Sequence, residues 1–183
     1  MKNLTKENIL EGLTRLSELA KEEKIVLEVS LYGGALMLLA YDARPSTKDV
    51  DAIIRPPEIG RRLAAKVAEE KGWHEDWLND DVRFFVSPVE TRQKWTPPGL
   101  NAPNLRISRP TAKYLLAMKV MACRKPLPGY LGDEADIGFL LRKMDIKSAS
   151  EVERVVEKYF PDTVLPAGTI AVLEKLLAHP KSS

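Results

Sequence analysis

The chain has 183 residues, of which 44% are hydrophobic and 30% are charged. This length and composition are typical of one folded domain or of two small subdomains, and they exclude a disordered chain. The net charge of +2 is too small to draw the whole molecule to nucleic acid or to an anionic membrane. No stretch reaches the roughly 18 apolar residues of a transmembrane helix, so we expect no membrane partner. The single cysteine, Cys123, cannot form an intramolecular disulfide, which favours a cytoplasmic location.

The first half of the chain alternates between helical and extended patterns. Thr5 is the expected N-cap of a surface helix whose apolar stripe runs through Leu19. A strand over residues 25–32, a helix over 35–43 and a strand ending at Arg55 follow. The next helix is predicted over residues 57–71, because Gly72 stops it.

The second half is predicted to be mainly helical. Strands are predicted over residues 82–86 and 105–108, with a proline-rich loop between them, and Pro110 is placed in the first turn of a helix. Ser148 and Glu151 have the spacing of a capping box. We therefore expect an α/β (α+β) fold: a small mixed, twisted sheet flanked by helices in residues 1–109, with a helical subdomain in residues 110–183 packed on it. The helices of that subdomain are predicted over residues 111–124, 137–144, 151–160 and 167–178.

Two adjacent glycines, Gly33 and Gly34, stand where the first strand must turn into a helix. Glycine permits the positive φ of a tight turn and lets a ligand approach the main chain closely. The helix that follows directs its free N–H groups and its positive dipole end toward the same place, which suits a phosphate. Paired glycines also occur in ordinary turns, so the pair indicates a phosphate site only together with other residues.

Asp49 and Asp51 are two residues apart in the second predicted strand. Side chains along a strand alternate between the two faces of a sheet, so both carboxylates are expected on one face. Carboxylate oxygens suit Mg²⁺, which proteins usually hold with one or two carboxylates plus substrate phosphates. Alternating aspartates are also found on ordinary solvated edges, so this pattern alone does not identify a metal site.

The stretch GGALMLLAYDARPSTKDVDAII resembles the signature of the DNA-polymerase-β-like nucleotidyltransferases: paired small residues, a helix, and Asp-x-Asp in a strand. The run Ser46–Asp51 is similar to the bacterial branch that contains AbiEii-type toxins. The resemblance implies a cytoplasmic, metal-dependent transferase that moves a nucleoside monophosphate from an NTP, such as ATP, to an acceptor hydroxyl. Mg²⁺ or Mn²⁺ would be the cofactor.

The same resemblance implies roles for individual residues. Gly33, Gly34 and Thr47 would bind the triphosphate, and Asp49 and Asp51 would hold the metal. In the second half, Lys119 would contact the nucleotide phosphates, and Asp136, with Asp133 as the competing choice, would support the catalytic cluster. A third carboxylate is usual in the superfamily, and here only Glu90 stands near the expected strand.

The acceptor and the biological partner are left open by the sequence. The acceptor could be a tRNA end, a protein side chain or a small molecule, and the toxin resemblance implies a neighbouring antitoxin protein. One alternative is a nucleotidyltransferase fold that has lost catalysis and acts in binding or regulation. Another is an RNA-binding module that uses the basic stretch 105–125, which holds six cations and no acid. Trp73 and Trp77 are expected in the core, and the alternative is that a nucleotide base stacks on them.

Overall fold

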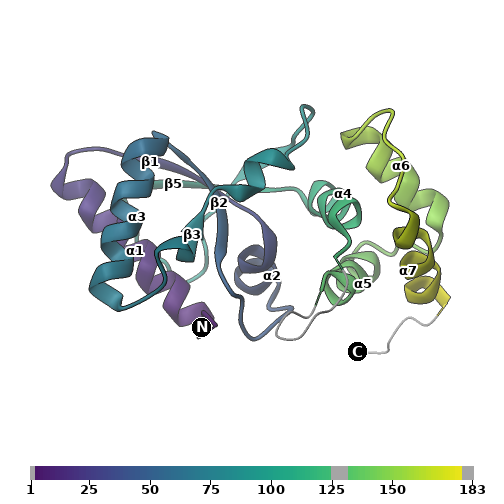
Figure 1. Cartoon of the computed structure of the whole chain (residues 1–183), viewed down its shortest axis with the longest axis horizontal. Helices are drawn as coiled ribbons and strands as arrows, with labels where there is room; N and C mark the ends of the chain where they lie inside the picture. Colours follow the sequence, from purple (N-terminus) through teal and green to yellow (C-terminus); the bar gives the residue numbers. More distant parts are fainter. Residues whose placement is uncertain (1–2, 125–131, 179–183) are drawn as a thin grey trace. The chain divides into compact units, whose positions relative to one another are not determined.

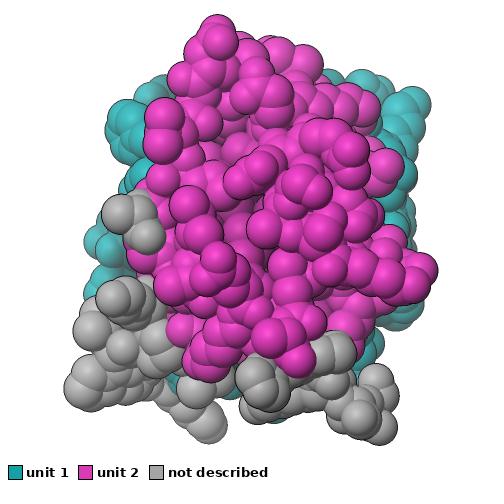
Figure 2. Space-filling view, turned by 90° about the vertical axis from the view of Figure 1, so that its right-hand side faces the viewer, with its two compact units in different colours: residues 1–85, 92–110 teal, residues 86–91, 111–183 magenta. Residues whose placement is uncertain are grey.

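The computed structural model describes residues 3–124 and 132–178 (Figure 1). The chain divides into two compact units, coloured in Figure 2. Unit 1 comprises residues 1–85 and 92–110, and unit 2 comprises residues 86–91 and 111–183. The two units divide after Pro110, and residues 86–91 group with the helical unit.

Unit 1 is built on a mixed five-stranded sheet with the strand order β3-β2-β1-β5-β4. β1 runs antiparallel to β2 and parallel to β5, β2 runs parallel to β3, and β4 runs antiparallel to β5. The strands are β1 (Leu27–Leu31), β2 (Val50–Arg55), β3 (Leu78–Asn79), β4 (Arg92–Lys94) and β5 (Leu105–Pro110). The helices of this unit are α1 (Lys6–Glu22), α2 (Gly33–Tyr41) and α3 (Pro57–Lys71), with the short 3₁₀ turns η1 (Glu75–Trp77) and η2 (Asp81–Phe84).

The core of unit 1 lies between the sheet and the helices α1 and α3. Alternate strand residues, such as Val29, Ala52 and Ile107, point into it, as the period of a strand requires. Trp77 is 2% exposed in this core, where its Nε1 donates to the Ala64 carbonyl at 2.9 Å. The expectation that Trp77 fills the core is confirmed, so a nucleotide base cannot stack on it in this conformation.

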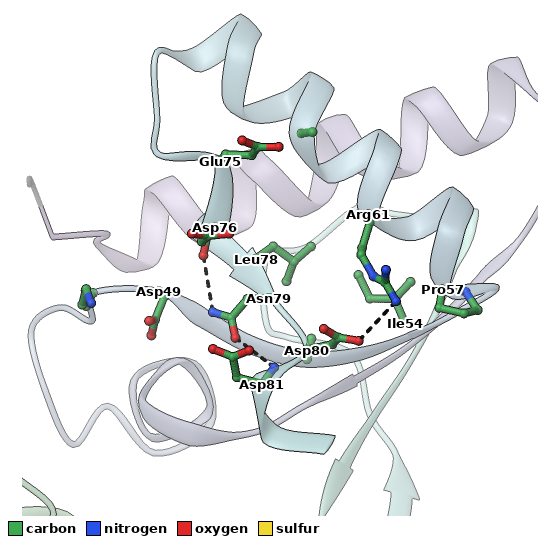
Figure 3. Close-up of a pocket in the computed structure, with 13 residues that line it drawn as sticks. Asp49, Ile54, Pro57, Arg61, Glu75, Asp76, Leu78, Asn79, Asp80 and Asp81 are labelled. Atoms are coloured by element: carbon green, nitrogen blue, oxygen red, sulfur yellow. Dashed lines mark hydrogen bonds and ion pairs between the residues drawn. The ribbon is translucent and has the colours of Figure 1, made fainter. Parts of the chain in front are cut away.

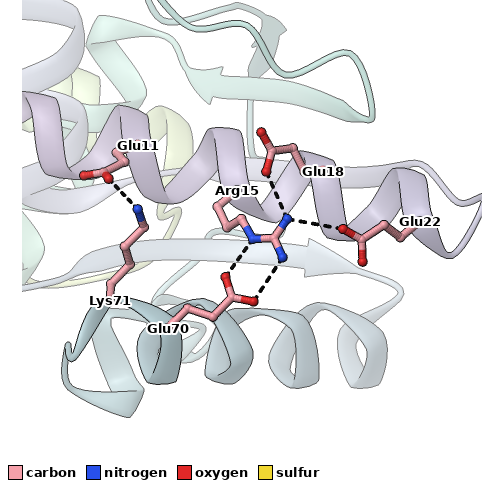
Figure 4. Close-up of polar contacts among 6 residues, drawn as sticks. All are labelled: Glu11, Arg15, Glu18, Glu22, Glu70 and Lys71. Atoms are coloured by element: carbon pink, nitrogen blue, oxygen red, sulfur yellow. Dashed lines mark hydrogen bonds and ion pairs between the residues drawn. The ribbon is translucent and has the colours of Figure 1, made fainter.

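The solvent side of α1 and α3 is held by an ion-pair network around Arg15 (Figure 4). Its guanidinium donates to both carboxylate oxygens of Glu70 on α3, at 2.7 and 3.0 Å, and pairs with Glu18 and Glu22 on α1. Hydrogen bonding to Arg15 lowers the pKa of Glu70 below its ordinary value. Such exposed pairs typically contribute about 0–1 kcal/mol each, so burial of the core supplies most of the packing energy between these helices.

The described residues of unit 2 form four helices and the segment 86–91. The helices are α4 (Ala112–Ala122), α5 (Glu134–Lys143), α6 (Ala149–Tyr159) and α7 (Ala167–Ala178). Ser87 attaches the segment, because its main-chain N–H donates to the Tyr114 hydroxyl at 2.7 Å and its Oγ donates to the Tyr159 carbonyl. The rings of Tyr114 and Tyr159 lie 5.0 Å apart and join α4 to α6.

Several sequence predictions are corrected by the structure. Residues 82–86 form no strand: the 3₁₀ turn η2 ends at Phe84, and Phe84 and Phe85 are exposed rather than packed in a sheet. The strand β4 was not predicted, and it lies just before the proline-rich loop 95–103. Pro110 ends β5 and does not enter a helix, because α4 begins at Ala112 with Thr111 as its N-cap.

Candidate functional site

The paired glycines form the turn between β1 and α2, as predicted. Tyr32 keeps an extended backbone, and its N–H donates to the Asp51 carbonyl on β2 at 2.9 Å. Gly33 has a φ of +59° and begins the helix, two residues earlier than expected. A left-handed φ favours glycine, so the first glycine is required by the backbone itself.

The side chain of Asp51 packs against this turn. A Cβ atom added to Gly33 would lie 1.8 Å from Asp51 Oδ2, which no real contact allows. The carboxylate therefore lies close to the N-terminus of α2, where the unpaired N–H groups and the helix dipole stabilise negative charge. This contact also has a purely structural explanation, because a carboxylate stabilises the helix end without any ligand.

The second glycine faces two other polar groups. A Cβ atom on Gly34 would lie 2.6 Å from Arg44 Nη1 and 2.6 Å from Thr47 Oγ1. Thr47 is 6% exposed, and its main chain pairs with Leu4 through two hydrogen bonds. Sequence reasoning singled out Thr47 but not Arg44, which stands in the loop between α2 and β2 and comes to the turn only through the fold.

Asp49 occupies a different setting from Asp51. β2 begins at Val50, so strand alternation fixes the face of Asp51 but not that of Asp49, which precedes the strand. Asp49 lines a pocket of about 410 Å³ beside α3 and β3 (Figure 3). Arg61 of α3 pairs with Asp80 in this pocket at 3.8 Å. The charged lining is mostly acidic and consists of Lys48, Asp49, Arg61, Glu75, Asp76, Asp80 and Asp81.

Asp51 shares its sheet face with a second polar group. Its strand neighbours are buried in the core, so Asp51 lies on the opposite face. On that face, the hydroxyls of Ser30 on β1 and Ser108 on β5 are 2.9 Å apart. Arg92 on β4 donates from Nη1 to Ser30 Oγ at 2.7 Å. The face that carries Asp51 therefore also carries a cation held by a buried hydroxyl.

The donor set for a metal in this region is small. Among residues 3–124 and 132–178, no three His, Cys, Asp or Glu side chains are grouped so that they could hold an ion. Two carboxylates hold Mg²⁺ in proteins where substrate phosphates and water complete the oxygen shell, and Asp49 and Asp51 would need such partners. Glu90, the remaining sequence candidate for a third carboxylate, belongs to unit 2.

Lys119 and the two predicted aspartates form a buried cluster in unit 2. Lys119 Nζ lies 2.7 Å from Asp133 Oδ1 and 2.8 Å from Asp136 Oδ2, and the Lys119 side chain is 6% exposed. Asp133 also accepts from the main-chain N–H and the Nε of Arg124, at 3.0 and 3.1 Å. Burial alone raises the pKa of Asp133, but the charge and hydrogen bonds of Lys119 and Arg124 together leave this pKa below its ordinary value.

The structure thus brings the predicted residues together in two separate sets. Gly33, Gly34, Thr47 and Asp51 meet at the N-terminus of α2 in unit 1, whereas Lys119 and Asp136 meet in unit 2. The basic stretch 105–125 is also divided, because Arg106 lies on β5 of unit 1 and Lys119 on α4 of unit 2. Among its described residues, the stretch therefore does not form one continuous basic helix.

Comparisons of the chain with protein-family models, with curated proteins and with solved structures found no match. Within the part of the chain that the structure describes, no helix is both long and apolar enough to cross a membrane.

Proposed function

We propose that the protein is a metal-dependent nucleotidyltransferase, which moves a nucleoside monophosphate from an NTP to an acceptor hydroxyl. The observation that carries this proposal is the meeting of Gly33, Gly34, Thr47 and Asp51 at the N-terminus of α2. A helix end with accessible N–H groups attracts phosphates, and a carboxylate beside it can share a cation with them. Neither the glycines nor the aspartates would carry the proposal alone.

In this proposal the chain's own residues bind and orient the substrate. The main chain of Gly33 and Gly34 and the Thr47 hydroxyl hold the triphosphate, and Asp49 and Asp51 hold Mg²⁺ or Mn²⁺. The bound ion would supply charge neutralisation at the phosphates. The acceptor oxygen bonds to the α-phosphorus, the bond from that phosphorus to the bridging oxygen breaks, pyrophosphate leaves, and the acceptor proton passes to a carboxylate or to water.

The predicted roles of Lys119 and Asp136 stay predictions. Their cluster is complete as an internal ion pair, because one ammonium faces two buried carboxylates. An ammonium near a transferred phosphoryl group would stabilise its charge, as the sequence resemblance implies. The paired state of Lys119 instead favours a role in holding α4 and α5 together.

The acceptor and the biological context are also proposals. A tRNA end or a protein side chain carries a suitable hydroxyl, and a toxin neutralised by an antitoxin protein is the setting that the resemblance implies. The principal alternative is a nucleotidyltransferase fold without catalysis, which binds a nucleotide or a protein. It is favoured by the donor set, since the described residues hold no group of three His, Cys, Asp or Glu side chains arranged for an ion.

The test is incubation with each α-labelled NTP, Mg²⁺ and bulk tRNA, with Asp49→Asn/Asp51→Asn as the control. Label entering RNA or protein only with the native chain would support the transferase. Mg²⁺-dependent NTP binding that the double substitution abolishes, without transfer, would support the inactive fold or an acceptor missing from the assay. If the native chain shows no transfer and no NTP binding, both the transferase and the inactive nucleotide-binding fold are refuted. RNA affinity that survives the double substitution and falls with salt would support the RNA-binding module.

A further inference from the structure

Arg109 on β5 is held by two aromatic rings of unit 1. Its guanidinium carbon lies 4.8 Å from the centre of the Trp95 ring and 5.6 Å from the centre of the ring of Tyr41, the last residue of α2. Such contacts are attractive, because the face of an aromatic ring carries partial negative charge. The two rings therefore restrict the direction of this side chain before any partner binds.

The ring contacts leave the hydrogen-bonding groups of Arg109 unused. Its Nε is buried and has no hydrogen-bond partner among the described residues, which is unfavourable for a donor. Within residues 3–124 and 132–178, the guanidinium contacts rings and not carboxylates. Of its three nitrogens only Nε is enclosed in this way, so the two terminal nitrogens are left for an incoming acceptor. Packing alone does not explain an arginine here, whereas binding of an anion does.

The strand beside Arg109 is an open edge of the sheet. β4 is the last strand in the order, and all three of its residues are exposed. The Trp95 N–H donates to the Ile107 carbonyl on β5, so the residue before it, Lys94, directs its main-chain N–H and carbonyl away from β5. Among the described residues, no strand lies on that side. An edge of this kind can pair with the main chain of an extended peptide.

The charge of this hairpin indicates which partner it can pair with. Residues 91–110, which contain β4, β5 and the loop between them, hold cations and no acid: Arg92, Lys94, Arg106 and Arg109. A second copy of the same edge would place cations opposite cations, which is unfavourable. An acidic peptide would bring carboxylates to them, and a guanidinium can hold a carboxylate with two parallel hydrogen bonds. RNA carries negative charge but lacks the peptide groups with which β4 could pair.

We propose that the β4–β5 hairpin binds an extended acidic segment of a partner protein, which pairs with β4 and places a carboxylate on the Arg109 guanidinium. Arg109 supplies the main side-chain contact, because the two rings already restrict it and less conformational entropy is lost on binding. The surface does not rest on the proposed nucleotide transfer, since none of its residues belongs to the turn at Gly33 or to the aspartate pair.

Selection from a library of random peptides displayed on phage tests this surface. The native chain should enrich peptides in which Asp or Glu recurs at alternate positions, because the side chains of a paired strand alternate between two faces. A synthetic copy of the most enriched peptide is then titrated by fluorescence anisotropy. Arg109→Gln should weaken its binding about 10- to 100-fold, because charge-assisted hydrogen bonds are lost. Arg109→Lys, which keeps the charge but not the fork, should lie between the two.

Two substitutions of Lys94 isolate the pairing at the edge. Both remove the charge, but only Lys94→Pro also removes the outward N–H, and proline is tolerated on an edge strand where that N–H faces away from the sheet. Lys94→Pro should therefore bind the peptide more weakly than Lys94→Gln. Arg62→Gln is the matched control, because it removes a guanidinium of unit 1 that pairs with Glu23 on the surface. It should bind the peptide as the native chain does.

Several results would overturn the proposal. The first is a selection that enriches no peptide, or peptides without an excess of acids. Equal binding by Lys94→Pro and Lys94→Gln would exclude pairing at β4, and this comparison decides the question even if Arg109→Gln fails to fold. A lower melting temperature of Arg109→Gln with unchanged peptide affinity would make the ring contacts structural. Tighter binding of an oligouridylate of equal charge would make the hairpin a nucleic-acid surface.

Discussion

Replacing Lys119 by methionine should destabilise the protein strongly. Methionine fills a similar volume but leaves Asp133 and Asp136 as buried carboxylates that have lost a shared ammonium at 2.7 and 2.8 Å. Removing one partner of a buried ion pair typically costs about 3–5 kcal/mol. In a chain of this length, each kcal/mol lowers the melting temperature by about 2–4 °C, so a fall of roughly 6–20 °C is expected. Thermal and urea unfolding followed by circular dichroism would measure it.

The control for this substitution lies in the same unit. Lys175 pairs with Glu134 at 2.9 Å, but the Lys175 side chain is 67% exposed. Lys175→Met should therefore cost less than about 1 kcal/mol. A double substitution, Lys119→Met/Asp136→Asn, should recover part of the loss, because it leaves one buried carboxylate fewer. If Lys119→Met unfolds like the native chain and loses only NTP affinity, Lys119 contacts the nucleotide and the structural interpretation is refuted.

Three further substitutions test other parts of unit 1 and unit 2. Gly33→Ala should lose metal-dependent NTP binding and stability, because the added Cβ would meet Asp51. Gly72 is the control: it has a similar φ of +65° but open space around it, so Gly72→Ala should cost only the backbone strain of about 1–3 kcal/mol. Urea unfolding and calorimetry compare the two variants. The pKa of Asp133 is lowered in the folded state. Its ionised carboxylate therefore stabilises the fold above the ordinary pKa of about 3.9, and this stabilisation is lost as the pH falls through the lower folded pKa. Asp133→Asn should therefore show a flatter loss of stability below about pH 4 in acid titrations. Trp77→Phe should cost about 1–3 kcal/mol in urea, because a buried hydrogen bond to the Ala64 carbonyl and part of a buried ring are lost, and should leave NTP affinity unchanged.

Helices with clear ends were predicted well from the sequence. α3 spans the predicted residues 57–71, and Gly72 ends it in the left-handed conformation. Ser148 caps α6 through the Glu151 N–H, as the capping box indicated. In each of these helices, local chemistry decides where the helix begins or ends. A single sequence contains that information without reference to the rest of the fold.

The sheet was predicted less well because its edges depend on partners. β3 and β4 have two and three residues, too few for alternation to be visible, and β4 is entirely exposed. The segment around Phe84 has the composition of a strand but lies in and just after a 3₁₀ turn, with 71% of Phe84 exposed. Hydrophobic and aromatic content predicts a strand only where a neighbouring strand is available to pair with it.

The candidate site also contains contacts that the local sequence could not predict. Gly33, Gly34 and Asp51 were found because their order along the chain resembles a known pattern, and the fold brings them into contact. Arg44 was missed because it lies in a loop, where neither periodicity nor a motif fixes the direction of a side chain. Only the return of that loop past the first turn of α2 puts a guanidinium on Gly34. A sequence pattern can therefore identify the glycines and the aspartate of the turn, whereas the position of a charged loop residue such as Arg44 is known only from the three-dimensional structure.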